Sequence, residues 1–259
     1  MDEPGLTGAM SSLPVLVAAG AAIGVLYGLF GVGSAFATPL LAALGVPGLA
    51  AVASPLPALL PGSAAGALAH GRGGAVDRRL AVRTIVGAGP ACVVGAVASA
   101  YVGGPWLLAL SGVVLIGVGI RVLVPMRSET PDRRDQLGLI YPLAVAVGLV
   151  AGLLSNGGGF LLVPLFLLLV GLELGEATAT SLTIVTVLSI PTLLTHAVLG
   201  DIAWGVALPF AVGLVPGSIL GARSAGHLPV ARMQAAFGLL LLIVGVWFVY
   251  RQLPAIGLR

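Results

Sequence analysis

Long uncharged stretches dominate the hydrophobic pattern of this chain and predict membrane-spanning helices. About 20 apolar residues are needed to cross the ~30 Å hydrocarbon core of a bilayer. Eight stretches are close to this length or exceed it, at residues 13–30, 48–69, 84–102, 105–125, 138–154, 177–199, 202–222 and 233–250. We expect each of them to form one long transmembrane helix.

Two shorter apolar pieces, near residues 35–45 and 160–171, follow glycine-rich interruptions of the pattern. An α-helix rises ~1.5 Å per residue, so each piece spans only about 17 Å and cannot cross alone without bilayer thinning or burial. We expect two half-helices here. The predicted fold class is an all-α integral membrane protein with eight long transmembrane helices plus two short half-helices, which allows 8–10 crossings.

Composition supports a multi-pass protein of the cell (cytoplasmic or inner) membrane. The chain is 58% hydrophobic and only 8% charged, whereas a soluble domain has about 25% charged residues. All 12 basic residues are arginines, and they lie in connections, where they set membrane orientation. No basic face with aromatic residues is present, so we expect no nucleic-acid partner. The single cysteine, Cys92, excludes an intrachain disulfide.

The charged connections divide the chain and orient it. Residues 70–83 and 121–135 hold eight of the 12 arginines and are separated by two crossings, so they share one side, which the positive-inside rule makes cytoplasmic. We expect a first transmembrane repeat at 1–125, a cytoplasmic linker at 126–137 and a second repeat at 138–259. The first residues lack a basic n-region, so we expect no cleavable signal peptide.

An internal duplication is indicated by glycine, proline and histidine residues that recur at a nearly constant spacing. Pairs at 126 residues are His70 and His196, Gly74 and Gly200, Pro90 and Pro216, and Gly95 and Gly221. Upstream pairs are spaced by 125 or 124 residues, as for Gly28 and Gly152. If each half-helix crosses the membrane, the two homologous halves are inverted repeats; if each is re-entrant, the halves are parallel. We favour inverted repeats.

The two glycine breaks are the candidate substrate site. Their residues are Gly31, Gly33 and Ser34 in the first half and Ser155, Asn156, Gly157, Gly158 and Gly159 in the second. Broken backbone at membrane depth must be buried or line a cavity, and a helix that starts there presents free N–H groups and the positive end of its dipole. Such an end binds anions without a charged side chain. The alternative roles are helix capping and close helix packing.

Several of these residues resemble the TauE/SafE family of sulfite and organosulfonate exporters. The similarity covers about residues 13–250, and its motifs are the glycine break from Ser155 to Pro164, Ala-Thr-Ala-Thr180-Ser181-Leu182, His196, Gly200-Asp201 and Pro216-Gly-x-x-x-Gly221-Ala222. The first half departs from the pattern, with Ser54-Pro-Leu in place of Thr-Ser-Leu. The resemblance implies a secondary transporter of small sulfur-containing or carboxylate anions, usually outward.

Thr180 and Ser181, with Ser54 as their counterpart, are further candidate ligands, although such hydroxyls also bond back to their own helix. His70 and His196 are candidates for proton coupling, because histidine titrates near neutral pH and no acidic residue lies inside a spanning segment. The alternative is an interfacial histidine bonded to loop backbone.

We therefore predict a transporter, most simply an exporter, of small anions such as sulfite, thiosulfate or sulfonates, bound mid-membrane between the two breaks. It needs no cofactor; its partners are the anion, the lipid bilayer and, if transport is coupled, protons. Alternatives are a passive anion channel or an uptake permease of the same fold, and a membrane enzyme or assembly factor. The three histidines lie in separate segments, so we expect neither a metal cluster nor a nucleophile–base pair. The oligomeric state stays open, with a homodimer as one alternative.

Overall fold

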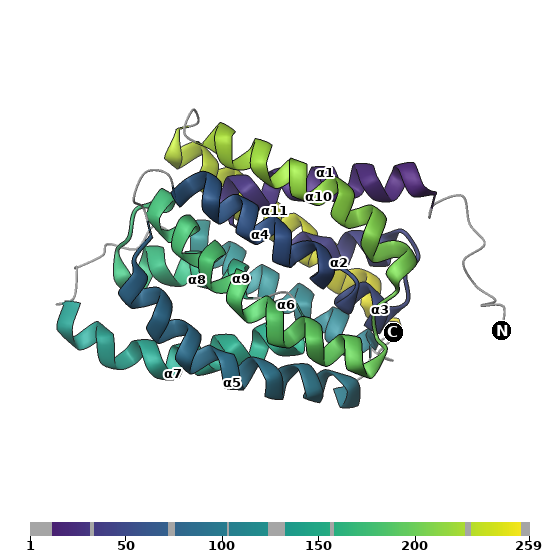
Figure 1. Ribbon diagram of the computed structural model, residues 1–259, viewed down its shortest axis with the longest axis horizontal. Coiled ribbons are helices and arrows are strands. Elements are labelled where there is room, and N and C mark those ends of the chain that lie inside the picture. The colour runs from purple at the N-terminus through teal and green to yellow at the C-terminus, as the bar shows by residue number, and fades with distance from the viewer. Residues whose placement is uncertain are drawn as a thin grey trace.

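The structure is a computed structural model that describes residues 12–31, 34–71, 76–102, 104–123, 133–155, 158–225 and 229–254. Every regular element in these ranges is a helix (Figure 1). In chain order they are α1 (Leu13–Phe30), α2 (Ser34–Ala43), α3 (Gly48–Ala53), α4 (Leu56–Gly71), α5 (Arg78–Val102), α6 (Gly104–Leu123), α7 (Arg133–Leu153), α8 (Gly159–Leu165), the π-helix η2 (Phe166–Val170), α9 (Leu174–Leu199), α10 (Trp204–Ala225) and α11 (Val230–Gln252).

Within the described residues, seven segments are long and apolar enough to cross a bilayer. They correspond to α1, α3 with α4, α5, α6, α9, α10 and α11. The expected count of eight is not confirmed, because the apolar part of α7, Ile140–Leu153, is shorter than the others. Large apolar side chains such as Val94, Leu208 and Val212 are exposed on the outer faces of these helices, as lipid contact requires. The chain is a multi-pass membrane protein.

The two predicted half-helices are present. The first is α2, and the second is α8, which continues directly into η2. The stretch 48–69, expected as one helix, is instead divided into α3 and α4 at Ser54–Pro55. Proline has no N–H to donate to a carbonyl one turn earlier, and its ring crowds that carbonyl, so the helical hydrogen bonding is interrupted there.

Glycine seams bring two pairs of long helices into backbone contact. A Cβ atom on Gly24 or Gly28 of α1 would lie within 3.0 Å of the carbonyl oxygens of Leu214 and Ser218 in α10, closer than real Cβ atoms approach. The residue numbers of the contacting positions rise together along the two helices, so α1 and α10 run in the same direction. Small residues permit this approach in membranes, where close packing replaces the hydrophobic effect between helices.

Glycines also bring the backbones of α5 and α7 into contact. A Cβ atom on Gly148 would collide with Ala88, and one on Gly152 with the backbone of Cys92 and Ala96. These helices also run in the same direction. Because α1 packs on α10 and α7 packs on α5, helices from the first and second parts of the chain alternate through the core.

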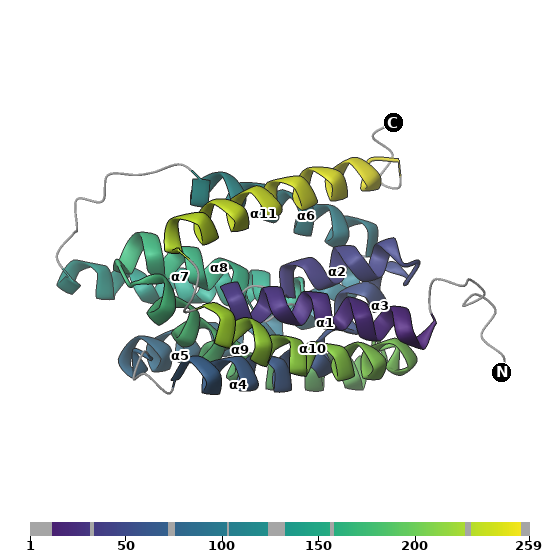
Figure 2. The same ribbon diagram turned by 90° about the horizontal axis from the view of Figure 1, so that it is seen from above.

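Two further pairs run antiparallel. In α6 and α11, Gly112 lies against Gly245 and Gly119 against Gly238. Figure 2 shows this pair side by side along one face of the molecule. In α4 and α9, the Thr186 hydroxyl donates to Ser63 Oγ at 3.0 Å, and Gly66, later in α4, lies against Leu182, earlier in α9.

Candidate functional site

Both glycine breaks interrupt helices inside the bundle. In the second half α7 ends at Leu153, and Gly158, in the left-handed region with φ 75°, precedes α8. In the first half α1 ends at Phe30, and Gly31 has the corresponding conformation with φ 70°. The predicted ligands Gly33, Asn156 and Gly157 lie outside the described residues, as does the side chain of Ser34.

The structure brings the two breaks into contact with each other. A Cβ atom on Gly159 would lie 2.7 Å from the Gly31 carbonyl oxygen, and one on Gly31 would lie 3.1 Å from Thr178 Cγ2. Gly31, Gly158 and Gly159 are all buried. The first break therefore meets the start of α8 inside the protein, and neither faces the lipid. A side chain at Gly159 would push the Gly31 carbonyl away.

Two hydroxyls of α9 lie beside this junction. The Ser181 hydroxyl donates to the Gly159 carbonyl at 3.3 Å, which ties α9 to the start of α8. Thr178, which packs on Gly31, is 1% exposed, and its hydroxyl has no hydrogen-bond partner in the described part of the chain. A buried hydroxyl without a partner is destabilising, so it calls for an explanation. Thr178 was not among the predicted ligands, because its spacing does not distinguish it from its neighbours.

Ser54 and Thr180 have a shared role that connects distant parts of the chain. The backbone N–H of Asp77, just before α5, donates to Thr180 Oγ1 at 3.0 Å. The N–H of Ala203, just before α10, donates to Ser54 Oγ at 3.0 Å. Each hydroxyl thus satisfies one of the N–H groups that a helix start leaves without an intrahelical acceptor. This contact is a cap, and binding of substrate by these two residues stays a prediction.

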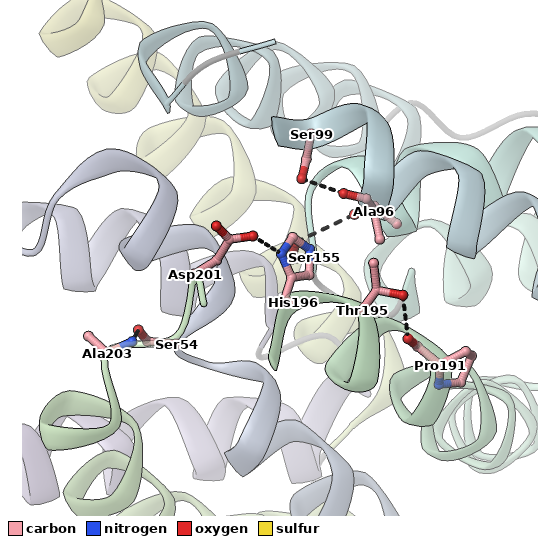
Figure 3. Close-up of polar contacts among 10 residues, drawn as sticks. Ser54, Ala96, Ser99, Ser155, Pro191, Thr195, His196, Asp201 and Ala203 are labelled. Carbon is pink, nitrogen blue, oxygen red and sulfur yellow. Dashed lines mark hydrogen bonds and ion pairs between the residues drawn. The ribbon is translucent and has the colours of Figure 1, made fainter. Parts of the chain in front are cut away.

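His196 is fully buried and is held at both ring nitrogens (Figure 3). Its Nδ1 is 2.8 Å from Asp201 Oδ2, and its Nε2 is 2.5 Å from Ser155 Oγ. Asp201 follows α9, whereas Ser155 follows α7 and has φ 51°, a left-handed conformation that serine rarely adopts. The carboxylate accepts from the ring, so in the neutral ring the proton sits on Nδ1 and Nε2 is the acceptor.

This contact corrects one expectation from the sequence. We expected no serine or other nucleophile within hydrogen-bond reach of a histidine, and the structure places Ser155 there. The two residues are 41 positions apart, so only helix packing joins them. The nearby acid, Asp201, was visible in the sequence five residues after His196, and that spacing was the available signal.

His70 has a simpler environment than its sequence counterpart. Its Nε2 donates to the Gly28 carbonyl at 2.9 Å, which links the end of α4 to α1. The position equivalent to Asp201 is Ala75, which carries no acid. In the described part of the chain no group of three or more histidine, cysteine or acidic side chains is arranged to hold a metal ion.

The sequence was compared with known families and proteins. The model of the family described as "Sulfite exporter TauE/SafE" matches residues 16–248. A "Probable membrane transporter protein" of Xylella fastidiosa (strain Temecula1 / ATCC 700964) is 28% identical over 255 residues, covering 94% of this chain and 97% of that protein. The "Probable membrane transporter protein YunE" of Bacillus subtilis (strain 168) is 23% identical, covering 68% of this chain and 71% of that protein. No solved structure is a significant match.

Proposed function

The chain belongs to the TauE/SafE family of membrane transporters, and on this premise we propose that it is a secondary transporter of small sulfur-containing anions. The substrate class includes sulfite, thiosulfate and short sulfonates, and it is bound where the two helix breaks meet. The observation that carries the proposal is the close approach of Gly159, at the start of α8, to the Gly31 carbonyl in the first break, inside the protein.

Helix directions support inverted repeats. By the sequence spacing, α4 corresponds to α9 and α6 to α11. Both of these pairs run antiparallel, as Ser63 with Thr186 and Gly112 with Gly245 indicate. Figure 1 likewise shows α1 and its counterpart α7 running in opposite directions. Two inverted halves related across the membrane plane are the arrangement in which transporters alternate access around a central site.

The distribution of arginines supports a cytoplasmic orientation for one end of the bundle. Figure 1 shows the ends of α4, α6 and α10 and the starts of α5, α7 and α11 at the same end of the bundle. In the sequence, the segments between these helices and the turns beside them contain ten of the 12 arginines. The positive-inside rule makes this end cytoplasmic. The α9–α10 connection, with Asp201, then lies at the outer end.

Anion binding at the junction follows from its donors. The half-helices α2 and α8 begin at the breaks and lack intrahelical acceptors for their first N–H groups. Thr178, beside Gly31, adds a hydroxyl that has no partner in the described part of the chain. Ser155 adds a second hydroxyl at the other end of the second break, beside His196. Neutral donors of this kind bind an oxyanion without the cost of placing a cation in the bilayer centre. We also assign Asn156, Gly157 and Gly33 to this site.

A membrane enzyme is the alternative from another class. Ser155, His196 and Asp201 are the residue types of a hydrolase triad, joined in the same order. A triad of this kind is a hydrolase only if it attacks its substrate, whereas a transporter needs no covalent step at Ser155. The match to a family of membrane transporters favours transport.

The test is binding and exchange of small anions by the purified protein. A ligand of the native state stabilises it by about 2.7 kcal/mol at 100 times its Kd. We expect sulfite, thiosulfate or a short sulfonate to raise the melting temperature, and the same anion to exchange across proteoliposomes. Thr178→Val should reduce the shift, whereas Thr183→Val should preserve it, because among the described residues the Thr183 hydroxyl bonds to the Ala179 carbonyl of its own helix. Normal exchange by both Gly158→Leu and Asn156→Ala would show that the site is elsewhere.

A further inference from the structure

The Ser155–His196–Asp201 group joins a titratable ring to the helix break, and its asymmetry suggests a specific task. We propose that His196 Nε2 is the binding site of a coupling proton, and that its protonation turns the Ser155 hydroxyl towards the anion. This inference rests on the proposed anion site and adds how that site is linked to protons. It distinguishes His196 from His70, whose only described polar contact is a backbone carbonyl.

The two protonation states of the ring place the Ser155 proton differently. In the neutral ring Nδ1–H donates to Asp201, so Nε2 accepts and the Ser155 O–H must point at it. When Nε2 gains a proton it becomes a donor, and Ser155 Oγ accepts. The serine hydrogen is then released. Its remaining acceptor among the described residues is the Gly152 carbonyl at 3.4 Å, which is a long contact.

The released hydroxyl lies at the Ser155 end of the second helix break and can donate to an oxyanion at that end. The net charge of the Ser155–His196–Asp201 group also favours anion binding when the ring is protonated. With a neutral ring the group carries the single negative charge of Asp201, which repels an anion. With a protonated ring the group is neutral overall. Proton and anion therefore favour each other's binding, and by linkage the effect is reciprocal.

Asp201 is a positioning residue in this scheme. Its side chain is 10% exposed and fixes the proton on Nδ1, which leaves Nε2 facing the break. It also stabilises the imidazolium, as the aspartate of a hydrolase triad does. The proton is taken up at Nε2, which faces Ser155 Oγ, and no covalent bond to the substrate is needed.

Other titratable or charged groups near α9 do not replace His196. On α5, Cys92 lies 3.1 Å from Thr192 Oγ1, and Tyr101 is 86% exposed. The charged residues at the start of α5 (Asp77, Arg78, Arg79 and Arg83) lie beside Thr180, as the Asp77 contact shows. Sixteen residues separate Thr180 from His196, which is roughly 24 Å along a helix. On α4 the titratable group is His70; α8 and η2 contain none, and Glu176 lies at the far end of α9.

The experiment measures net proton movement and net anion uptake in the same proteoliposomes, which contain no sulfonate at the start. A short alkanesulfonate is the probe, because it stays ionised and carries no proton of its own. A trapped pH dye reports protons, and labelled sulfonate reports uptake. The wild type should move protons with the sulfonate. His196→Gln and Asp201→Asn should reduce the number of protons moved per sulfonate taken up at least tenfold, and Ser155→Ala should uncouple the two similarly.

Thr195→Val is the matched control, since Thr195 neighbours His196 and, among the described residues, its hydroxyl bonds to the Pro191 carbonyl of its own helix. It should keep the wild-type ratio. Net sulfonate uptake without proton movement by the wild type, or full coupling in Asp201→Asn, would overturn the assignment while the anion site stands. A wild type that neither binds nor exchanges any of the tested anions would instead refute the proposed function, and the proton site with it.

Discussion

The seam between α1 and α10 gives a quantitative prediction, because the two backbones touch. Gly213 of α10 faces α1, where a Cβ atom would lie 2.7 Å from the Ala21 nitrogen and closer still to the Val17 carbonyl oxygen. Real Cβ atoms keep at least 3.0 Å, so Gly213→Ala requires the helices to separate by about 1 Å. Neither neighbour can rotate away, since both are backbone atoms.

The size of the effect follows from packing. One methyl group forced into a packed interior costs about 1–3 kcal/mol, and a backbone clash belongs at the upper end. About 2–4 °C of melting temperature is lost per kcal/mol in a domain of this size, so Gly213→Ala should melt roughly 6–12 °C lower. Cys92, the single cysteine, is fully buried, so a thiol-reactive dye reports unfolding directly.

The control is on the same helix. A Cβ atom on Gly205 of α10 meets nothing within 4 Å, so Gly205→Ala should melt at or above the wild-type temperature. Alanine is preferred to glycine in a helix by about 1 kcal/mol. If Gly213→Ala melts at the wild-type temperature, α1 and α10 do not pack through this glycine seam.

Two other predictions concern the caps and the orientation. Removing either capping hydroxyl, by Ser54→Ala or Thr180→Val, should destabilise the protein by about 1 kcal/mol, measured as a lower melting temperature in detergent. Unchanged melting of both variants would show that these caps are not formed. In a Cys92→Ala background, Val198→Cys at the outer end of α9 should react with a membrane-impermeant maleimide in intact cells, and Arg79→Cys at the start of α5 should react only after permeabilisation; the opposite pattern would reverse the orientation.

Local sequence determined the membrane class and the positions of the breaks. Spanning helices are recognised from uncharged length, because the bilayer cannot satisfy free backbone groups. The same reasoning located α2 and α8, where glycines interrupt the apolar runs at Gly31 and Gly158. Regular spacing of glycine and histidine suggested a duplication. The division at Ser54–Pro55 was not predicted, because the residues on both sides of it are apolar and the hydrophobic pattern continues across it.

Only the tertiary structure decided which distant residues meet. Ser155 and His196 are 41 residues apart, and Ser54 and Ala203 are 149 residues apart. A sequence pattern specifies hydrogen bonds within a helix, since their partners are one turn away. Contacts between helices depend instead on which helices pack together, and the positions of the glycines decide which backbones can approach closely. Helix packing gives His196 the Ser155 hydroxyl and His70 the Gly28 carbonyl, whereas the Asp201 carboxylate comes from five residues further along the chain.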